Sequence, residues 1–472
     1  MNSGLYIKQT ILAAAAFIAA YMLSLTEAYI ASGTVLIAAG IAIAVIYIKK
    51  SSKLSEPAAY FSISWISGCG VSAMKLSRLQ SDWVLETWLC FFFAYAFFIF
   101  GYALFSLRKS LDNDESSLSA AESDKVDIVN RKLYADGLMT AINIVVLLSV
   151  SSLIAESVIL GYIPLFTKDT PHAYSYFHVS GLHYFTVSCV LVPSLAVLWY
   201  KQQGGIKDKS DKLRAFDIAL CCISSIIIPL LLVSRFQLIF AVLLSGMTYI
   251  CVNNGRLPFK IGLREILIGL GLFSVLVVFY VFITVERAHS IEYLNEIFEM
   301  KYRLPIFLSQ PYIYIANNFD NFNCLTEALT EYAGGLRMLF PLFALTGLKF
   351  THPEFVAFPI FVTKEELTTV TLIYDAYYDF GIMGVMMFTF VLGAVMACLG
   401  ACIRKNVNAS MIPAFIYAQL DFYLLFAFFT TWFSNPATWF YLIASAAIGI
   451  FICLYVKFAE RIYRHNIEGG SK

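Results

Sequence analysis

Apolar runs recur along the whole chain and are separated by short polar segments. Most are about 18 residues or longer, the length that crosses the hydrocarbon core of a bilayer as an α-helix. Barrel strands are shorter, about 10 residues, and alternate in polarity. The pattern therefore predicts an all-α polytopic integral membrane protein with about 12 transmembrane helices. The predicted spans are 5–26, 30–48, 57–74, 84–107, 138–160, 179–200, 215–233, 236–252, 262–284, 371–402, 412–432 and 438–456.

Two polar segments interrupt this single transmembrane domain, which we take as residues 1–472. Residues 108–137 are acidic and rich in serine, which predicts a cytoplasmic linker exposed to solvent. Residues 285–370 combine charges, aromatic rings and prolines, which predicts a long ordered loop. Within it, the spacing of Ile291, Leu294 and Ile297 predicts an amphipathic helix, and the apolar run 336–348, too short to span, predicts a re-entrant or interfacial piece.

The distribution of basic residues predicts the orientation in the membrane. With the N-terminus inside, the inner segments hold most of the 33 lysines and arginines. The positive-inside rule then places both termini in the cytoplasm and the 285–370 loop outside. The chain is 59% hydrophobic and its net charge is only +1, so it has no basic surface suited to nucleic acid, and nucleic-acid binding is excluded.

Known cofactor motifs do not occur in the sequence. Of the ten cysteines, only Cys324 falls in the predicted outer loop, so no disulfide framework can form there. CxxC pairs, HExxH and other zinc spacings do not occur, and neither do Walker-type or GxGxxG loops. We therefore expect no bound metal and no nucleotide cofactor.

Arginines on the outer side point to an anionic ligand. Arg235 stands at the outer end of a hairpin of two membrane spans, which is a costly place for a charge unless it snorkels or meets an anion. Arg287, Arg303 and Arg337 lie in the long outer segment, where the positive-inside rule disfavours cations. Guanidinium groups bind phosphate through paired hydrogen bonds, so converging arginines would suit a lipid-linked diphosphate.

Histidines and carboxylates on the outer side are candidates for proton transfer. His178 and His183 flank the entry to the sixth span, and Glu156 lies near the outer end of the fifth. Asp375 and Asp379 are four residues apart, which places them on one helix face near the outer boundary. A buried carboxyl or an imidazole could take a proton from a hydroxyl. Interfacial packing of the histidines, and acids that complement a helix dipole, are the structural alternatives.

Aromatic and amide side chains alternate between residues 312 and 323. Tyr314 and neighbouring rings bracket polar groups that include Asp320. Rings stack on the C–H faces of sugars while polar side chains bond to hydroxyls, so the pattern predicts a carbohydrate platform. An aromatic belt at the membrane surface is the alternative. The segment then returns to the membrane through a predicted helix-capping box at residues 363–366.

Four features resemble a known family when they are taken in order along the chain. They are GYIPLF at 161–166, Ser234-Arg235 at the start of the eighth span, the long loop, and YYDFG at 377–381 followed by Gly384. Together they resemble Wzy-type oligosaccharide repeat-unit polymerases, which make O-antigen, capsule and related bacterial surface polysaccharides. The resemblance extends from about Gly161 to the C-terminus.

The resemblance implies a metal-independent glycosyltransferase of the GT-C type in the bacterial inner membrane. Such an enzyme transfers a growing glycan from undecaprenyl diphosphate to the next lipid-linked repeat unit at the periplasmic face. Asp379, His178 or Glu156 would activate the acceptor hydroxyl. The substrate would be bound by Arg235, Arg287, Arg303, Arg337, Asp375, Asp320, His183 and Tyr314.

The resemblance also implies partners and leaves alternatives open. The expected partners are the undecaprenyl-diphosphate-linked oligosaccharide, the lipid bilayer and a polysaccharide co-polymerase that regulates chain length. An O-antigen ligase would use the same donor and a similar loop but transfer the glycan to a lipid A core. A lipid-linked oligosaccharide flippase or another transporter is the alternative outside the enzymes, although a flippase has no need of a long ordered outer loop.

Overall fold

The computed structural model describes residues 3–111, 124–167, 173–205, 208–256, 271, 291–302, 304–405 and 411–469. Within these ranges every regular element is a helix, and β pairing is limited to one isolated bridge between Ser77 and Met300. Nine of the helices described there are apolar and long enough to cross a bilayer. The predicted all-α polytopic fold is confirmed, because lipid requires each spanning segment to satisfy its own backbone hydrogen bonds.

The helices follow the predicted order. The N-terminal group is α1 (Ser3–Leu25), α2 (Tyr29–Ser51), α3 (Pro57–Phe61), η1 (Ser62–Ile66), α4 (Ser67–Ala73) and α5 (Leu85–Leu111). The central group is α6 (Asp124–Leu160), η2 (Pro164–Phe166), α7 (Ala173–Tyr176), α8 (Leu182–Val187), η3 (Ser188–Leu191), α9 (Val192–Gln203), α10 (Lys209–Leu231) and α11 (Arg235–Val252). The long outer segment contains α13 (Ile291–Phe298), α14 (Ile306–Ala328), α15 (Phe340–Thr346), α16 (Leu348–Thr351) and η4 (Pro353–Phe355). The last group is α17 (Tyr374–Lys405), α18 (Met411–Leu425), η5 (Trp432–Ser434) and α19 (Pro436–Gly469).

Several predicted spans differ in detail from the helices observed. The span 57–74 is interrupted by the π-helical turn η1, and α18 ends at Leu425, seven residues before the predicted end at 432. The span 262–284 falls almost entirely outside the described residues, so the number twelve stays a prediction. In the predicted 108–137 linker, α5 extends to Leu111 and α6 begins at Asp124, and residues 112–123 lie outside the described part.

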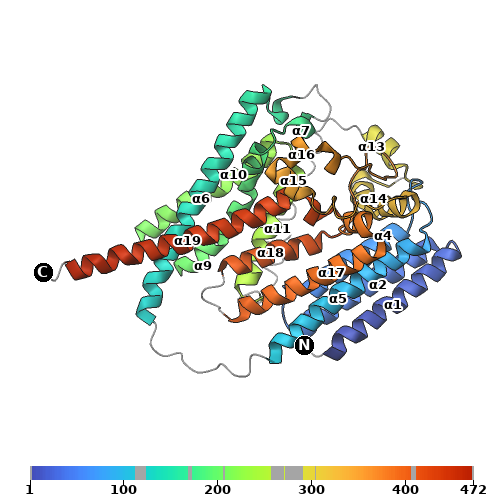
Figure 1. The fold of residues 1–472 in the computed structure, drawn as a ribbon, viewed down its shortest axis with the longest axis horizontal. Coiled ribbons are helices and arrows are strands. Elements are labelled where there is room, and N and C mark those ends of the chain that lie inside the picture. The colour runs from blue at the N-terminus through green and yellow to red at the C-terminus, as the bar shows by residue number, and fades with distance from the viewer. Residues whose placement is uncertain are drawn as a thin grey trace.

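Close helix packing holds the N-terminal half to the C-terminal half. Helices α5 and α17 run side by side in Figure 1 and pack along each other. Gly101 and Gly393 permit this approach, because a Cβ on either would collide with a backbone carbonyl, of Phe390 and Phe98 respectively. Small residues at helix crossings are what membrane packing favours.

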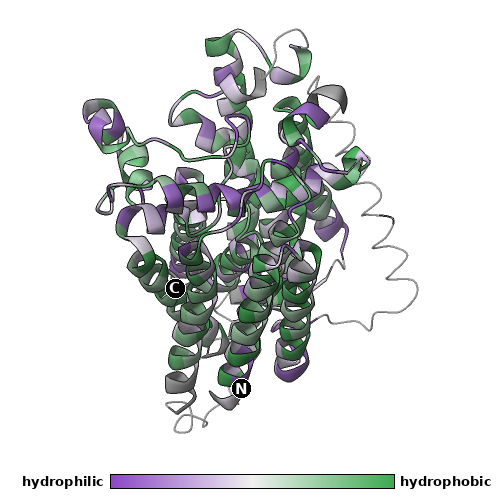
Figure 2. Ribbon diagram, turned by 90° about the vertical axis from the view of Figure 1, so that its right-hand side faces the viewer, coloured by the Kyte–Doolittle hydropathy of each residue, from purple (hydrophilic) through white to green (hydrophobic). Residues whose placement is uncertain are grey.

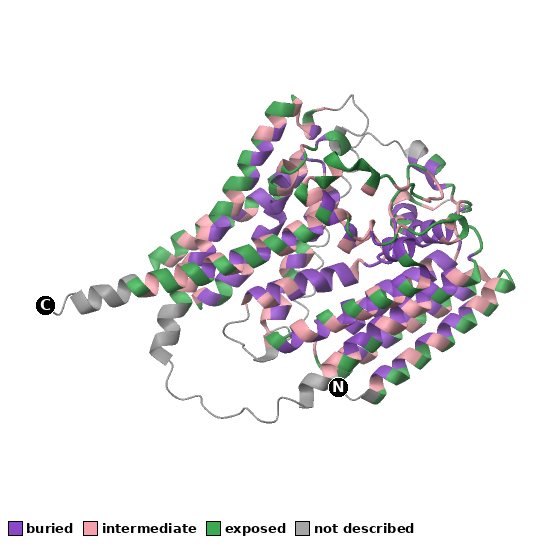
Figure 3. Ribbon diagram, in the orientation of Figure 1, coloured by how far each residue is buried: buried purple, intermediate pink, exposed green. Residues whose placement is uncertain are grey.

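The outer segment forms a cap on one end of the bundle. Figure 1 shows α13 to α16 gathered away from both termini, and Figure 2 shows that polar residues collect at this end while the membrane helices are mostly apolar. In Figure 3, α14 is the most deeply buried part of the cap. Leu294, Ile297 and Phe298 of α13 are buried and pack with α14 residues, so the predicted amphipathic helix exists and covers α14.

The predicted capping box at 363–366 is wrong, because α17 begins eight residues later, at Tyr374. The Thr363 hydroxyl donates to Asn317 Oδ1 at 2.7 Å, and its backbone N–H donates to Asn321 Oδ1 at 2.8 Å. The Thr363 groups that a helix start would have used therefore attach this irregular segment to α14 instead. Sequence-local capping signals compete with such long-range bonds, and here the long-range bonds prevail.

Candidate functional site

A cavity of about 460 Å³ lies in the cap end of the bundle. Its walls come from α8 and the residues just before it, α11, the α15–α16 segment, α18, η5 and the start of α19. A volume of this size fits a drug-sized or monosaccharide-sized ligand. We take it as the candidate functional site because it combines histidines, a lysine, helix N-termini and aromatic rings, as described below.

Two long helices direct their N-termini at this cavity. Ser234, Phe236 and Gln237 at the start of α11 line it, and so do residues 435–438 at the start of α19. Ser234 occupies the N-cap position of α11 without a side-chain capping bond, whereas Asn435 Oδ1 accepts the N–H of Ala437 at 2.9 Å. Helix N-termini carry partial positive charge and exposed N–H donors, so the arrangement favours an anion.

Lys349 and Arg235 strengthen this positive character. Lys349 of α16 lines the cavity. Arg235, the first residue of α11, is buried and stands between the lining residues Ser234 and Phe236 in the chain, and its Nη2 donates to the Tyr314 hydroxyl at 3.4 Å. The structure therefore brings together two residues predicted to bind substrate, Arg235 and Tyr314. An N–H donor and a cation close to an anion site act more strongly here than in water, because the surroundings are apolar.

Two histidines, His178 and His183, line another part of the cavity, and a carboxylate, Glu156, lies behind them. Glu156 is fully buried and accepts the N–H of Val179 at 3.0 Å and the Thr186 hydroxyl at 2.6 Å. His183 Nδ1 lies 3.2 Å from both Glu156 oxygens. The rings of His178 and His183 meet edge to face, with centroids 5.1 Å apart.

The surroundings of His178 keep its ring neutral. Partial burial, followed by the nearby His183, lowers the pKa of His178 below its usual 6.5, and the Lys349 charge acts in the same direction. A neutral imidazole at pH 7 can both donate and accept hydrogen bonds. The structure therefore brings three separately predicted candidates together, with His178 and His183 facing the cavity and Glu156 behind them.

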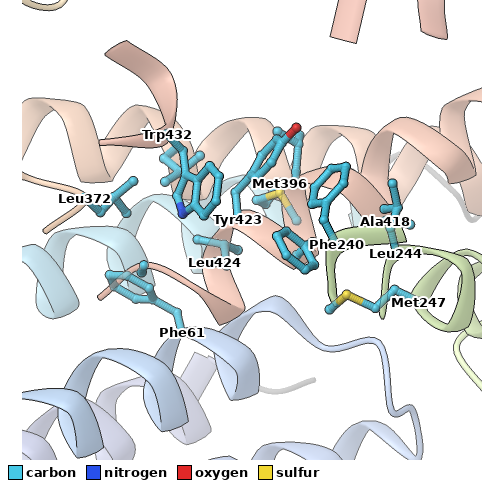
Figure 4. Close-up of a cluster of buried hydrophobic side chains, with 14 of the residues drawn as sticks. Phe61, Phe240, Leu244, Met247, Leu372, Met396, Ala418, Tyr423, Leu424 and Trp432 are labelled. Carbon is cyan, nitrogen blue, oxygen red and sulfur yellow. The ribbon is translucent and has the colours of Figure 1, made fainter. Parts of the chain in front are cut away.

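Aromatic rings make up the deepest wall of the cavity. Phe240, Tyr423 and Trp432 line it and also belong to the buried cluster drawn in Figure 4. The Tyr423 and Trp432 rings stack with centroids 5.0 Å apart at 26°. Such rings pack against the C–H faces of sugars, and their rotamers are fixed by the core behind them.

A second cavity, of about 230 Å³, shares the Phe340 wall with the first. Arg337 and Asp375 line it among apolar residues. Arg337 Nε donates to Asp375 Oδ1 at 2.5 Å, and its guanidinium lies 4.6 Å from the centroid of the Tyr378 ring. An internal carboxylate thus balances the charge of Arg337, and its predicted phosphate-binding role stays a prediction.

Asp379 is not placed to act as the predicted base. It is fully buried, and its carboxylate accepts the N–H groups of Arg337 at 3.1 Å and Met338 at 2.8 Å. The helix is broken just after it: Phe380 and Gly381 leave helical geometry, with Gly381 at φ +61° and ψ −148°. Asp379 therefore fixes the loop that carries Arg337 to α17, and neither cavity is lined by it.

Asp320 was predicted to contact sugar, and the structure contradicts that prediction. The residue is fully buried in the cap, where Trp83 Nε1, Gln80 Nε2 and Ser72 Oγ donate to it at 2.9, 2.7 and 2.9 Å. Burial raises its pKa to about 6, against the lowering effect of these donors. The neighbouring amides of α14 are buried too and hold backbone carbonyls of other segments. The amide-rich pattern therefore serves folding of the cap, because a buried polar group must find partners inside the protein.

Some predicted residues cannot be placed, and some important ones were missed. Arg287 and Arg303 lie outside the described residues. Lys349, Trp432 and Asn435 line the first cavity but were not predicted. Lys349 could have been found, because the positive-inside argument used for the outer arginines applies equally to a lysine. Trp432 and Asn435 follow α18 at a distance from every motif, and only the folded chain shows where they lie.

Comparison with known proteins gives one match. The model of the family described as "Putative O-antigen polymerase" matches residues 76–427, well over half of the chain. No curated protein and no solved structure matches. The matched region includes α5 to α18 and eleven of the seventeen residues that line the first cavity; the six between Trp432 and Tyr441 follow it in the chain.

Proposed function

Because the chain belongs to the O-antigen polymerase family, we propose that it joins undecaprenyl-diphosphate-linked oligosaccharides into a surface polysaccharide. The family membership supports a role in polysaccharide polymerisation and a multi-pass membrane location. The proposal adds that whole repeat units are transferred at the periplasmic face of the inner membrane by a GT-C-type glycosyltransferase. A co-polymerase that regulates chain length is a proposed partner.

One observation carries the proposal: the cavity between the N-termini of α11 and α19. A lipid diphosphate leaves as an anion when the glycosidic bond to it breaks. Helix N-termini and Lys349 lie where that developing charge would be stabilised, and such preorganised charge is often the largest contribution to catalysis. Aromatic walls and two histidines on the same cavity supply the other parts that a glycosyl transfer needs.

The proposed orientation agrees with the placement of the cavity. The cap that holds it lies at the end of the bundle opposite the N-terminus, as Figure 1 shows. The basic residues of the sequence favour a cytoplasmic N-terminus, which would put the cavity at the periplasmic face. Lipid-linked repeat units awaiting polymerisation would then reach it from the outer leaflet.

A deletion strain tests this function directly. The strain would be complemented with the wild-type chain, with Arg235→Ala or with Lys349→Gln, and its surface glycan resolved on a gel. We expect the deletion to leave single repeat units on the lipid core and the wild-type chain to restore a long ladder. Loss of all surface glycan with accumulation of lipid-linked polymer would instead show a ligase, and an unchanged ladder in the deletion would contradict both enzyme functions.

A further inference from the structure

Burial of the Glu156 carboxylate costs free energy, and hydrogen bonds within the fold offset that cost. Glu156 lies near the end of the membrane helix α6, and none of its surface is exposed. A carboxylate in that place must be paired or hydrogen-bonded. A backbone N–H, a hydroxyl and an imidazole all converge on it, from Val179, Thr186 and His183.

These contacts determine which nitrogen of His183 carries a proton. The carboxylate can only accept, so the Nδ1 atom that faces it at 3.2 Å must be an N–H donor. In the neutral ring, Nε2 then has a lone pair. The His183 side chain is 21% exposed and lines the cavity, while Glu156 is sealed off behind it. The arrangement is that of an imidazole held in one tautomer by a carboxylate.

We propose that His183 is the base that deprotonates the acceptor sugar, with Glu156 as its positioning residue. The inference rests on the proposed function and assigns roles within that same cavity. It differs from the sequence-based expectation, which gave Glu156 itself the part of a base and His183 that of a substrate contact. Glu156 cannot touch a substrate because it is fully buried.

The step balances without any further reactant. The acceptor hydroxyl gives its proton to Nε2 of His183 while its oxygen forms a bond to the anomeric carbon of the donor glycan. The bond between that carbon and the diphosphate oxygen breaks, and undecaprenyl diphosphate leaves with the electron pair. Glu156 stabilises the imidazolium that results, and the proton is later released to water.

Other titratable groups around the cavity set the electrostatics of this step. Glu156 from α6 favours a charged imidazole, whereas Lys349 from α16 opposes it. His178 packs against His183; burial is the largest cause that lowers the pKa of His178, and Glu156 acts against it. The phenols of Tyr184, Tyr423 and Tyr441 complete the wall and stay protonated at neutral pH. Because a general base acts only in its unprotonated form, the rate should fall on acidification.

The test uses purified full-length chain in lipid nanodiscs. Lipid-linked repeat units extracted from the deletion strain serve as substrate, and polymer formation is followed over a range of pH. The variants are His183→Ala, Glu156→Gln and, as matched control, His352→Ala, an exposed histidine that pairs with Glu354 outside the cavity. Thermal unfolding of each variant shows whether it is folded, and added imidazole tests for chemical rescue of His183→Ala.

We expect His183→Ala to lower kcat by about 10²-fold or more, with KM changed much less, and imidazole to restore part of the rate. Glu156→Gln should lose a similar factor, because its amide N–H₂ can turn the ring to the wrong tautomer. The acid limb of the pH profile should shift in Glu156→Gln and disappear in His183→Ala. His352→Ala should match the wild type.

The proposal is overturned if folded His183→Ala keeps more than a tenth of the wild-type kcat, or if imidazole gives it no added rate. It is also overturned if Glu156→Gln lowers the melting temperature without changing the pH profile, which would make Glu156 purely structural. These outcomes leave the polymerase function standing. If the wild-type chain itself makes no polymer from these substrates, the proposed function fails and the assignment of the base fails with it.

Discussion

Replacement of Asp320 by alanine should destabilise the cap without changing the chemistry of the site. The change removes the shared acceptor of three hydrogen bonds. In the variant, Ser72 Oγ can still donate to the Ala316 carbonyl, 2.9 Å away, and Gln80 Nε2 can still donate to the Ser72 carbonyl, also 2.9 Å away. Trp83 Nε1 keeps no other acceptor among the hydrogen bonds found in the described residues.

The number of hydrogen bonds lost sets the size of the expected fall in stability. A buried donor left without an acceptor costs about 1–3 kcal/mol, and each of the two bonds that lose their charged partner contributes about 1 kcal/mol more. Relief of the burial penalty that raises the pKa of Asp320 to about 6 offsets part of this. We therefore expect the free energy of unfolding to fall by about 2–4 kcal/mol for Asp320→Ala and by roughly half as much for Asp320→Asn, which keeps one acceptor oxygen.

Thermal unfolding of the detergent-purified protein, together with polymer formation per folded molecule, measures both consequences. The apparent melting temperature should fall by several degrees while the folded fraction retains wild-type kcat and KM. Glu354→Ala is the control, because this carboxylate is exposed and should change neither quantity. If Asp320→Ala instead melts like the wild type but loses activity, Asp320 contacts the substrate after all and the structural reasoning is refuted.

Three further outcomes follow from the same geometry. The pKa of Asp320 is about 6 in the folded protein and 3.8 ordinarily, so the folded state binds the proton more tightly. The free energy of unfolding should therefore decline by up to about 3 kcal/mol as pH rises from about 4 to 6. Chemical unfolding at each pH should show this slope in the wild type and a reduced slope in Asp320→Asn. Gly381→Ala should lower the free energy of unfolding by about 1–3 kcal/mol, because φ is +61° and the new Cβ would lie 2.8 Å from the Tyr332 hydroxyl. Thermal unfolding measures this loss, and an unchanged melting temperature would contradict the observed break in α17. Lys349→Gln should weaken binding of a lipid diphosphate about tenfold. Lys364→Gln is the control, because Lys364 pairs with Glu299 outside the cavity and its loss should leave the affinity unchanged. Equilibrium binding of undecaprenyl diphosphate to each variant in nanodiscs measures the difference.

The candidate site shows where the reading of the sequence was reliable. His178, His183 and Glu156 were singled out from position relative to the spans, and the structure brings them together. Arg235 and Tyr314 were chosen for different reasons and lie in contact. These residues lie together because the ends of neighbouring helices are confined to one thin layer of the protein, so few arrangements are open to them; their roles stay predictions.

The same reasoning failed where burial decided the role of a residue. Asp320 and Asp379 are residue types that often function in catalysis or binding, yet both are buried here. Each accepts hydrogen bonds from donors far away in the sequence. Asp320 is reached by Trp83, 237 residues earlier in the chain. No local pattern reports such contacts, since they depend on how the cap closes over the bundle.

The sequence by itself determined the all-α membrane architecture. Each spanning helix must on its own be long enough and apolar enough to cross the lipid, so this property can be recognised in single segments. It also determined the family, through motifs placed in a fixed order. Only the tertiary structure decided which polar groups face the cavity and which are buried. That distinction arises where α11, α19, α8 and the α15–α16 segment meet: His183 lines the cavity there, and Glu156 is buried behind it.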